Sequence, residues 1–318
     1  MSLPIGAAYA APVPHGRTAQ RLTWEFLPPG LRTQITQRLG SEVVCAESQN
    51  AGFTPGFASL LTGTDGAQVF VKAASRVAQA PFAAAYAEEA RVLRALDGRL
   101  PAPRLHWVIN DEWTVLGIEA VPHRRPARPW DREELGRALD LCEQVAAELS
   151  QPPPGLDLEP VYDDQPAFIT GWRRFAAVEL DWPHLIEASE LADALPEVPM
   201  THLVHCDLRD DNVLLADDGR TLACDWNHPA LGPAWLDAVT LLISAHGDGL
   251  PTDELLSQRA FTRDADPDHI DRWLAAVAGF MLDARERPSP QSSPYLQTHC
   301  NWWAEAAWGW LAQRRGWN

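Results

Sequence analysis

One segment of this sequence carries residue types that could transfer a phosphoryl group. Residues 205–212 read His-Cys-Asp-Leu-Arg-Asp-Asp-Asn, an H-x-D-x-x-x-x-N pattern, and Asp225 follows after a short turn. Phosphoryl transfer needs an acid that accepts a hydroxyl proton and oxygen ligands that hold Mg²⁺. Asn212 and Asp225 offer such oxygens, which leaves Asp207 to orient an attacking hydroxyl.

These acids could also be ordinary turn residues, because Asp and Asn are common in hairpins. We assign that plainer role to three acids of the segment, Asp210, Asp217 and Asp218. For Asp207, Asn212 and Asp225 together, we favour the role in phosphoryl transfer. Its spacing fits a loop followed by a hairpin, and the hairpin returns the second acid beside the first.

The chain has a single lysine among its 26 basic residues, Lys72, at the end of the β-prone run VFVK. A lone surface lysine is usually just a solvated charge. At the end of a strand, however, a mobile point charge suits the binding of a triphosphate. Such a lysine needs a carboxylate to position it, and Glu88 and Glu89 follow 16 and 17 residues later on a predicted helix.

The segment NAGFTPGF, residues 50–57, lies between the first two predicted strands. Gly52 and Gly56 would allow backbone amides to approach phosphate oxygens closely. Two glycines and a proline also make an ordinary hairpin turn, so the segment is weak evidence when taken alone.

The elements that must position these residues change character along the chain. A helical pattern over 22–39 is interrupted at Pro28-Pro29. Period-two runs, Gly-containing turns and one Ala-rich run then predict five strands and a helix. The strands are expected at 42–48, 58–62, 68–73, 104–109 and 113–121, and the helix at 81–96.

The second half of the chain is mostly helical by pattern. A Pro- and Arg-rich connector, 122–130, precedes it, and residues 201–232 form an island of strand and loop within it. Helices are expected at 132–149, 166–180, 184–195, 233–245, 268–286 and 295–315. We therefore divide the chain into an arm and helix (1–40), a β-rich lobe (41–121), the connector (122–130) and a helical lobe (131–318).

The island resembles the catalytic segment of the aminoglycoside phosphotransferase family, which has a protein-kinase-like fold. In that family an Asp-aromatic pair and a G-P-x-x-x-D stretch follow the H-x-D-x-x-x-x-N loop, and here these are Asp225-Trp226 and residues 232–237. The resemblance covers about residues 40–245. It implies an α+β bilobal fold, with a small five-stranded antiparallel β lobe carrying one main helix and a larger helical lobe.

The resemblance also implies roles for individual residues. Asp207 would be the catalytic base, Asn212 and Asp225 the ligands of Mg²⁺, and Lys72 the phosphate-binding cation. Glu89 matches the family's glutamate better than Glu88 does. The backbone of Glu119 and Val121 would meet the adenine edge, so ATP is the expected nucleotide, with GTP left open. Three residues would support the loop: His205, Arg209, and Asp237, which would brace it through backbone amides.

Two departures from the family pattern matter. Cys206 stands where glycine is frequent, and Asn227 stands two residues after Asp225, where a second acid is frequent. A neutral amide weakens any second metal site but leaves the first.

Composition excludes several classes of protein. The net charge of the 318 residues is −17, residues 1–121 contribute zero to it, and no basic surface suited to nucleic acid is evident. No run approaches the ~18 apolar residues of a membrane span. Residues 1–16 are interpreted as a loose arm rather than a signal peptide. Five scattered cysteines without a CxxC pair indicate a reducing cytoplasm.

The helical lobe carries all of the acid excess and many tryptophans. Four acids near its end, Asp264, Asp266, Asp268 and Asp271, could face a polycation, although each alone is more typical of a solvated surface. Four tryptophans, Trp302, Trp303, Trp308 and Trp310, favour core packing, with an aromatic substrate wall as the alternative.

The sequence therefore predicts an ATP- and Mg²⁺-dependent O-phosphotransferase that acts on a hydroxyl of a small molecule. The charge distribution favours a cationic acceptor. The family resemblance adds that this acceptor would be a cationic antibiotic or an amino sugar, which would mean resistance or self-protection. The enzyme would be a cytoplasmic monomer or homodimer. One alternative is a non-catalytic nucleotide-binding pseudokinase. A protein kinase is disfavoured, because Gly232-Pro233 begins only seven positions after Asp225 and leaves little room for an activation loop.

Overall fold

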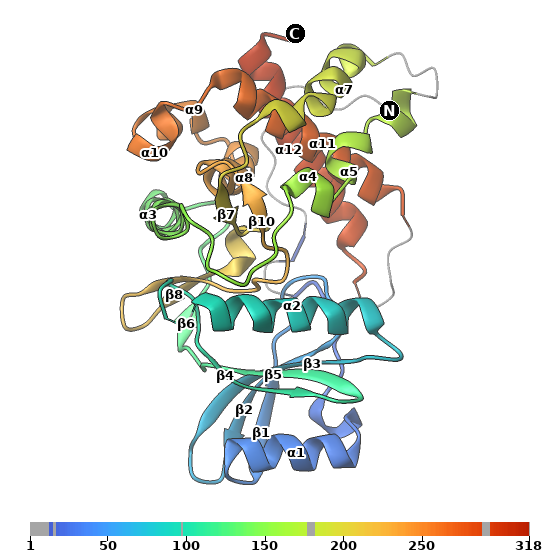
Figure 1. Ribbon diagram of the computed structural model, residues 1–318, viewed down its shortest axis with the longest axis vertical. Helices are drawn as coiled ribbons and strands as arrows, with labels where there is room; N and C mark the ends of the chain where they lie inside the picture. The colour runs from blue at the N-terminus through green and yellow to red at the C-terminus, as the bar shows by residue number, and fades with distance from the viewer. Residues whose placement is uncertain (1–12, 15–16, 97, 177–181, 288–292, 318) are drawn as a thin grey trace.

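The computed structural model describes residues 13–14, 17–96, 98–176, 182–287 and 293–317. A β-rich part lies below a helical part in Figure 1, and helix α2 (Ala80–Leu96) lies between them. The expected α+β class is confirmed.

The β-rich part contains the expected five-stranded antiparallel sheet, in the order β1-β2-β3-β5-β4. Its strands are β1 (Val43–Ser48), β2 (Phe57–Gly63), β3 (Gln68–Ser75), β4 (Leu105–Asn110) and β5 (Trp113–Ile118). Strand β5 was predicted to reach Val121 and instead ends at Ile118. The Glu119 amide makes one more bond, to the Arg104 carbonyl at 2.8 Å, before the chain leaves the sheet.

The alternation of side chains along β3 decides which of its residues can face the helical part. Val71 and Ala73 pack on one face of the sheet with Ile35 of α1 (Pro29–Leu39). Because successive side chains of a strand point to opposite faces, Phe70 and Lys72 lie on the face that α2 covers. Helix α1 lies under the sheet and α2 over it in Figure 1.

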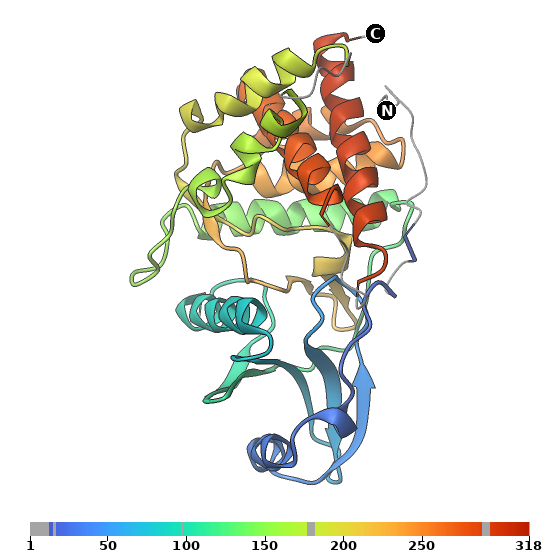
Figure 2. The same ribbon diagram turned by 90° about the vertical axis from the view of Figure 1, so that its right-hand side faces the viewer.

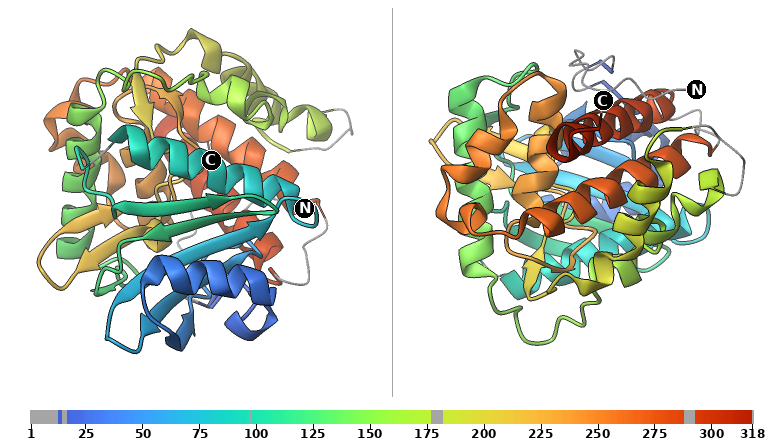
Figure 3. Two further views of the ribbon diagram at one scale, coloured as in Figure 1. Left: turned by 60° about the horizontal axis from the view of Figure 1, so that its bottom comes forward. Right: turned by 90° about the horizontal axis from the view of Figure 1, so that it is seen from above.

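The helical part is built around long helices with tryptophan-rich interfaces. These helices are α3 (Arg132–Glu148), α7 (Leu185–Asp193), α8 (Leu236–Gly247), α11 (Pro267–Arg285) and α12 (Leu296–Arg315). Helices α11 and α12 run side by side in Figures 2 and 3. Side-chain caps begin two of the helices, since Asp131 accepts from two amides of α3 and Asp266 from one amide of α11.

The island of strand and loop forms two small sheets. Strand β7 (His202–Val204) pairs with β10 (Ala230–Gly232), and β8 (Val213–Ala216) pairs with both β9 (Thr221–Ala223) and β6 (His123–Arg124). A 3₁₀ turn, η3 (Asp210–Asn212), leads into β8. Strand β6 lies within the predicted connector and ties that segment to the β8–β9 hairpin.

Several predicted helix bounds were wrong. The helix expected at 166–180 is replaced by α5 (Ala167–Thr170) and α6 (Arg173–Ala176), and residues 177–181 lie outside the described residues. The pattern over 22–39 divides at the predicted interruption, with a 3₁₀ turn, η1 (Trp24–Phe26), before it and α1, which begins at Pro29, after it. The helix expected from Pro233 begins at Leu236. Four further elements are too short to show a helical period: α4 (Val161–Asp164), η2 (Leu195–Glu197), α9 (Thr252–Ser257) and α10 (Ala260–Arg263).

The C-terminal tryptophans belong to the core, as their pattern favoured. Trp302, Trp303, Trp308 and Trp310 are each at most 5% exposed. The Trp308 ring contacts those of Trp172 and Trp317, and the Trp310 indole donates to Asp253 at 3.1 Å.

The predicted acidic face is largely neutralised by arginines of the same helices. Asp271 is 5% exposed and pairs with Arg314 and Arg315 of α12, and Asp268 pairs with Arg272 and Arg315. Asp266 caps α11 instead of facing a ligand. These contacts do not support the idea that this cluster binds a polycation.

Close packing at Gly279 of α11 generates a stability prediction. A Cβ at this position would lie 2.5 Å from the indole of Trp172, which is fully buried. Replacement by alanine would overpack the core, and we expect Gly279→Ala to lower the free energy of unfolding by about 1–3 kcal/mol in urea denaturation.

The matched control is Gly136→Ala in α3, where an added Cβ would meet no atom within 4 Å. That change should leave the free energy of unfolding unchanged or raise it by up to about 1 kcal/mol, because alanine is the better helix former. Equal effects of the two substitutions would contradict the packing argument.

Candidate active site

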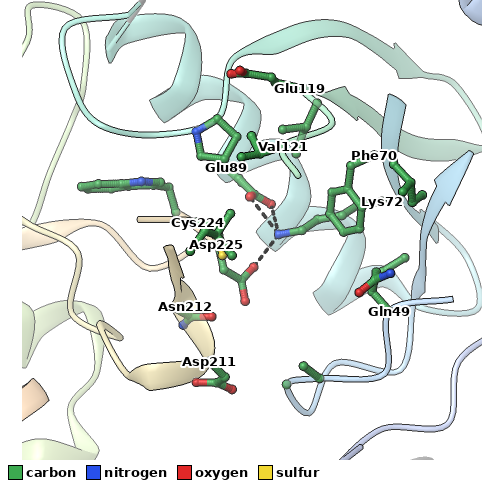
Figure 4. A pocket seen from close by; sticks show the side chains of 18 of the residues that line it. Gln49, Phe70, Lys72, Glu89, Glu119, Val121, Asp211, Asn212, Cys224 and Asp225 are labelled. Atoms are coloured by element: carbon green, nitrogen blue, oxygen red, sulfur yellow. Dashed lines mark hydrogen bonds and ion pairs between the residues drawn. The ribbon is translucent and has the colours of Figure 1, made fainter. Parts of the chain in front are cut away.

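The single lysine is the centre of a buried ion-pair network that joins three elements. The Lys72 ammonium lies 2.8 Å from both carboxylate oxygens of Glu89, on α2, and 2.6 Å from Asp225 Oδ1, after β9. Figure 4 shows these contacts as dashed lines. Lys72 is 8% exposed and Glu89 is 1% exposed, so neither is a solvated surface charge.

Glu89, and not Glu88, is the carboxylate that reaches Lys72. Glu88 lies one position round the helix and pairs with Arg91 through Nε at 2.9 Å. The sequence left open which of the two glutamates positions Lys72. Because α2 has 3.6 residues per turn, the two side chains point in different directions, and only that of Glu89 faces Lys72.

In this network, burial and the neighbouring charges shift the pKa values of the three groups in opposite directions. Burial disfavours the Lys72 ammonium, but Asp225 and Glu89 more than offset this effect and raise the pKa of Lys72. Burial likewise works against ionised Asp225, yet the Lys72 ammonium prevails and lowers the pKa of Asp225 to about 2. Burial raises the pKa of Glu89, which Lys72 opposes. All three groups depend on one another for their charge state.

The loop between β7 and η3 is held through its backbone. The amides of His205 and Cys206 donate to the two carboxylate oxygens of Asp237 at 2.9 and 3.0 Å, from the first turn of α8. Cys206 adopts a left-handed conformation, with φ of 64°, which glycine adopts without strain and other residues adopt rarely.

His205 is fully buried under the same loop. Its Nε2 lies 2.9 Å from the Cys224 carbonyl, and its ring contacts Trp226. Burial lowers the pKa of His205, with Asp237 opposing, so the ring is neutral at physiological pH. This buried position fits the supporting role that the sequence predicted for His205.

Asn212 and Asp225 are brought together by the β8–β9 hairpin. The Cys224 amide donates to the Asn212 carbonyl at 3.0 Å, which places the two candidate metal ligands beside one another. The Asn212 side-chain amide donates to the Asp207 carbonyl at 2.7 Å, so its Oδ1 stays available as an acceptor. Asp225 has a φ of 69° and uses only Oδ1 on Lys72.

Asp207 lies at the base of the loop with Arg209 beside it. Arg209 Nε is 3.3 Å from Asp207 Oδ1 and 3.2 Å from Asp211 Oδ1. Burial raises the pKa of Asp207, while the Arg209 guanidinium opposes the rise. The Asp207 side chain is 31% exposed, so an incoming hydroxyl could reach it.

These residues fit a nucleotide-bound Mg²⁺ better than a metal held by protein alone. Within the described ranges, no three His, Cys, Asp or Glu side chains gather as a metal site. Two oxygens, Asn212 Oδ1 and Asp225 Oδ2, suit Mg²⁺, which usually keeps waters and takes other ligands from substrate phosphates. Asn227 is buried, its Oδ1 has no hydrogen-bond partner among the described residues, and it is not one of the residues that line the cavity described next.

Most of the predicted site residues line one cavity between the sheet and the helical part (Figure 4). Leu60, Phe70 and Ile118 form part of its apolar wall. The predicted residues on this cavity are Gly52, Lys72, Glu89, Glu119, Val121, Asn212 and Asp225, and those off it are Gly56, His205, Asp207, Arg209 and Asp237.

The chain beyond β5 presents backbone groups suited to an adenine edge. The Glu119 amide is bonded to Arg104, and the Val121 carbonyl lies 2.6 Å from His123 Nδ1. The Glu119 carbonyl and the Val121 amide have no hydrogen-bond partner in the described part of the chain. An acceptor and a donor two residues apart match the amino group and ring nitrogen of adenine.

The two glycines of the 50–57 segment differ in role. Gly52 has a φ of 73° and lines the cavity, so it can approach a phosphate. A Cβ at Gly56 would lie 2.7 Å from the Tyr86 hydroxyl, so packing accounts for this glycine. Arg21, which sequence reasoning missed, also lines the cavity and bonds to this segment. It lies 30 residues before Ala51, and no local pattern marks it.

The sheet with its buried Lys–Glu pair and the helical part with its H-x-D-x-x-x-x-N loop define a kinase-like phosphotransferase fold. The model of the phosphotransferase enzyme family matches residues 57–273, about two thirds of the chain. The chain belongs to this family.

Solved structures share the fold at low identity. Amicoumacin kinase hAmiN, in complex with AMP-PNP, Ca²⁺ and Ami, has a TM-score of 0.59 at 14% identity, over 88% of this chain and 93% of its own. Choline kinase LicA from Streptococcus pneumoniae has a TM-score of 0.60 at 14% identity, over 89% and 98%. An aminoglycoside phosphotransferase from Alicyclobacillus acidocaldarius subsp. acidocaldarius DSM 446 has a TM-score of 0.54 at 15% identity, over 91% and 96%.

Two further observations concern relatives and membranes. Comparison with curated protein sequences finds no match. Among the described residues, no helix combines the length and the apolar character needed to cross a lipid bilayer.

The lysine network generates a second stability prediction. Lys72→Met would leave Glu89 buried without its cation, and breaking a buried ion pair in this way typically costs about 3–5 kcal/mol. We expect a loss of that size in the free energy of unfolding at pH 7. Adding Glu89→Gln should recover part of it, because the stranded buried charge is then removed.

The same variant should respond to pH in a defined direction. Without Lys72, the folded-state pKa of Glu89 lies above its unfolded value of about 4.3. The loss in Lys72→Met should therefore be smallest near pH 4 and grow as the pH rises through the folded-state pKa. Urea denaturation between pH 4 and 8 measures this trend, and a loss that is independent of pH would contradict it.

Proposed function

We propose that this chain transfers the γ-phosphoryl group of ATP, with Mg²⁺, to a hydroxyl group of a small molecule. The observation that carries the proposal is the convergence of Lys72, Glu89, Asn212 and Asp225 on one cavity, with Asp207 bonded to Asn212 at its edge. GTP remains an alternative nucleotide.

The nucleotide would bind between the β-rich lobe, 41–121, and the helical lobe, 131–318. Adenine would meet the Glu119 carbonyl and the Val121 amide. Lys72, held by Glu89, would bind the phosphates. A bound Mg²⁺ would neutralise phosphate charge at Asn212 and Asp225. Because these groups are already positioned by the fold, little reorganisation would be needed during the reaction.

Asp207 would orient the acceptor hydroxyl and accept its proton. The base must lie near the phosphates but off the metal, and the bond from Asn212 to the Asp207 carbonyl supports this role because it keeps Asp207 next to a proposed metal ligand. Asp237 would hold the loop in place through the two backbone amides. His205 would support the loop through its bond to the Cys224 carbonyl, and Arg209 through its contact with Asp207.

The acceptor is proposed to be a small hydroxylated molecule, and a cationic antibiotic or amino sugar is the class to test first. One structural neighbour is an amicoumacin kinase whose named ligands include Ami, and another neighbour is a choline kinase. An antibiotic acceptor would make the protein a resistance or self-protection enzyme, acting in the cytoplasm as a monomer or homodimer.

Loss of Asp207 tests the proposed chemistry. Acceptors would first be found by measuring ATP consumption across hydroxylated cationic metabolites, with mass spectrometry to detect an added phosphate. With such an acceptor, Asp207→Asn should lower kcat by about a thousandfold or more, or ~4 kcal/mol of barrier, because the proton acceptor is lost. The Kd for ATP should change little.

The matched control is Asp218→Asn, on the exposed turn of the β8–β9 hairpin, which should keep wild-type kcat. Near-normal kcat in Asp207→Asn would refute the assigned role. Binding of ATP by the wild-type protein, without transfer to any acceptor, would instead support a pseudokinase.

The proposed metal site predicts a cation requirement. Chelation of divalent ions should abolish transfer, and added Mg²⁺ should restore it. In Asp225→Asn the Mg²⁺ concentration for half-maximal activity should rise by about tenfold or more, because a charged ligand is lost. Asp217→Asn, on the same exposed turn, should leave the Mg²⁺ titration unchanged. Full activity in the presence of chelator would rule the site out.

A further inference from the structure

A segment before the first helix is bonded along the glycine-containing loop 50–56. The amides of Thr18 and Ala19 donate to the Asn50 carbonyl at 2.8 and 3.0 Å, and the Thr18 hydroxyl donates to the Gly52 carbonyl at 2.5 Å. Both residues are 7% exposed. In Figure 2 this segment, in dark blue, rises from η1 beside the sheet toward the helical part.

Arg21 extends these contacts across the loop. Its Nη1 donates to the Thr54 carbonyl and its Nη2 to the Ala51 carbonyl, each at 2.6 Å. One guanidinium thus binds both sides of the turn that contains Gly52. Because the donor is charged, these bonds are stronger than ordinary backbone bonds and hold the turn in one shape.

The guanidinium also belongs to the nucleotide cavity. Arg21 lines the same space as Lys72 and Asp225, and its positive charge helps to lower the pKa of Asp225. A guanidinium has five N–H donors. Two are used by the loop, and Nε is buried without a partner. One N–H on each Nη is left without a bond to any described residue.

Charge balance explains why a second cation is needed here. Lys72 carries +1 and its two partners, Glu89 and Asp225, carry −1 each, so the network sums to −1. A polyphosphate entering this cavity would be repelled by the network unless other cations compensate. Mg²⁺ is one such cation. Two arginines, Arg21 and Arg125, line the cavity, and Arg21 is the one bonded to loop 50–56.

We propose that Arg21 is a second phosphate-binding cation, supplied by the N-terminal segment, which also fixes the loop that covers the phosphates. The inference rests on the proposed function, because it needs a nucleotide in this cavity. It extends the nucleotide site to a part of the chain that lies before residue 57, where the family match begins.

The test compares ligands that differ only in phosphate number. Dissociation constants of ATP, ADP and adenosine are measured by calorimetry at constant Mg²⁺ for the wild type and for Arg21→Met. We expect Arg21→Met to raise the dissociation constant of ATP about 10–100-fold, as for loss of charged hydrogen bonds, and that of ADP by less. Adenosine should change by no more than about twofold.

Two control variants separate charge from scaffolding. Arg17→Met removes an exposed arginine from the same segment and should leave all three constants unchanged. Thr18→Val removes a loop bond without removing a charge, so it should affect ATP much less than Arg21→Met does. Arg21→Lys keeps a charge and should retain part of the preference for ATP over adenosine.

The outcomes are distinguishable. Equal weakening of ATP and adenosine in Arg21→Met, or the same pattern in Thr18→Val, would show that Arg21 is only a scaffold and overturn the inference. Unchanged constants in Arg21→Met would overturn it as well. If the wild type binds neither ATP nor ADP, the proposed function itself fails, and the inference falls with it.

Discussion

The rest of the site depends on the burial of one ammonium group between two carboxylates. Lys72 comes from the sheet, Glu89 from α2 and Asp225 from the end of β9, and the three meet within 2.8 Å. A buried charge is tolerated only when it is paired. The ion pairs therefore fix the positions of β3, α2 and the chain after β9 relative to one another. This constraint sets the distance between the β-rich and helical parts and shapes the cavity between them.

The helical part positions its side of the cavity by a different means, through backbone bonds rather than ion pairs. Asp237 accepts from two consecutive amides of the loop, and Asn212 donates to the Asp207 carbonyl. Left-handed conformations at Cys206 and Asp225 turn the chain where regular structure would carry the side chains away. Specific contacts hold both positions, since the Cys206 amide donates to Asp237 and Asp225 Oδ1 accepts from Lys72.

Charge is distributed less simply than the net value of −17 suggests. On α11, acids are matched by arginines of α11 itself and of α12, so much of the acid excess near the C-terminus is internally compensated. In the cavity proposed to bind the nucleotide, charge balance matters for the proposed function. There one lysine serves two carboxylates, and the loop over the cavity holds Arg21.

The sequence by itself determined the α+β class, the five strands and the spacing of the loop residues, because periodicity and turn preference depend only on residues that are close in the sequence. It also singled out Lys72, by rarity. Only the tertiary structure decided between Glu88 and Glu89, which depends on which face of α2 meets the sheet. It also replaced the helix expected at 166–180 with two short ones, beside the close approach of Gly171 to Gly279. No local pattern could have indicated Arg21, since its partners lie 30 and 33 residues away in the sequence and only folding brings them together.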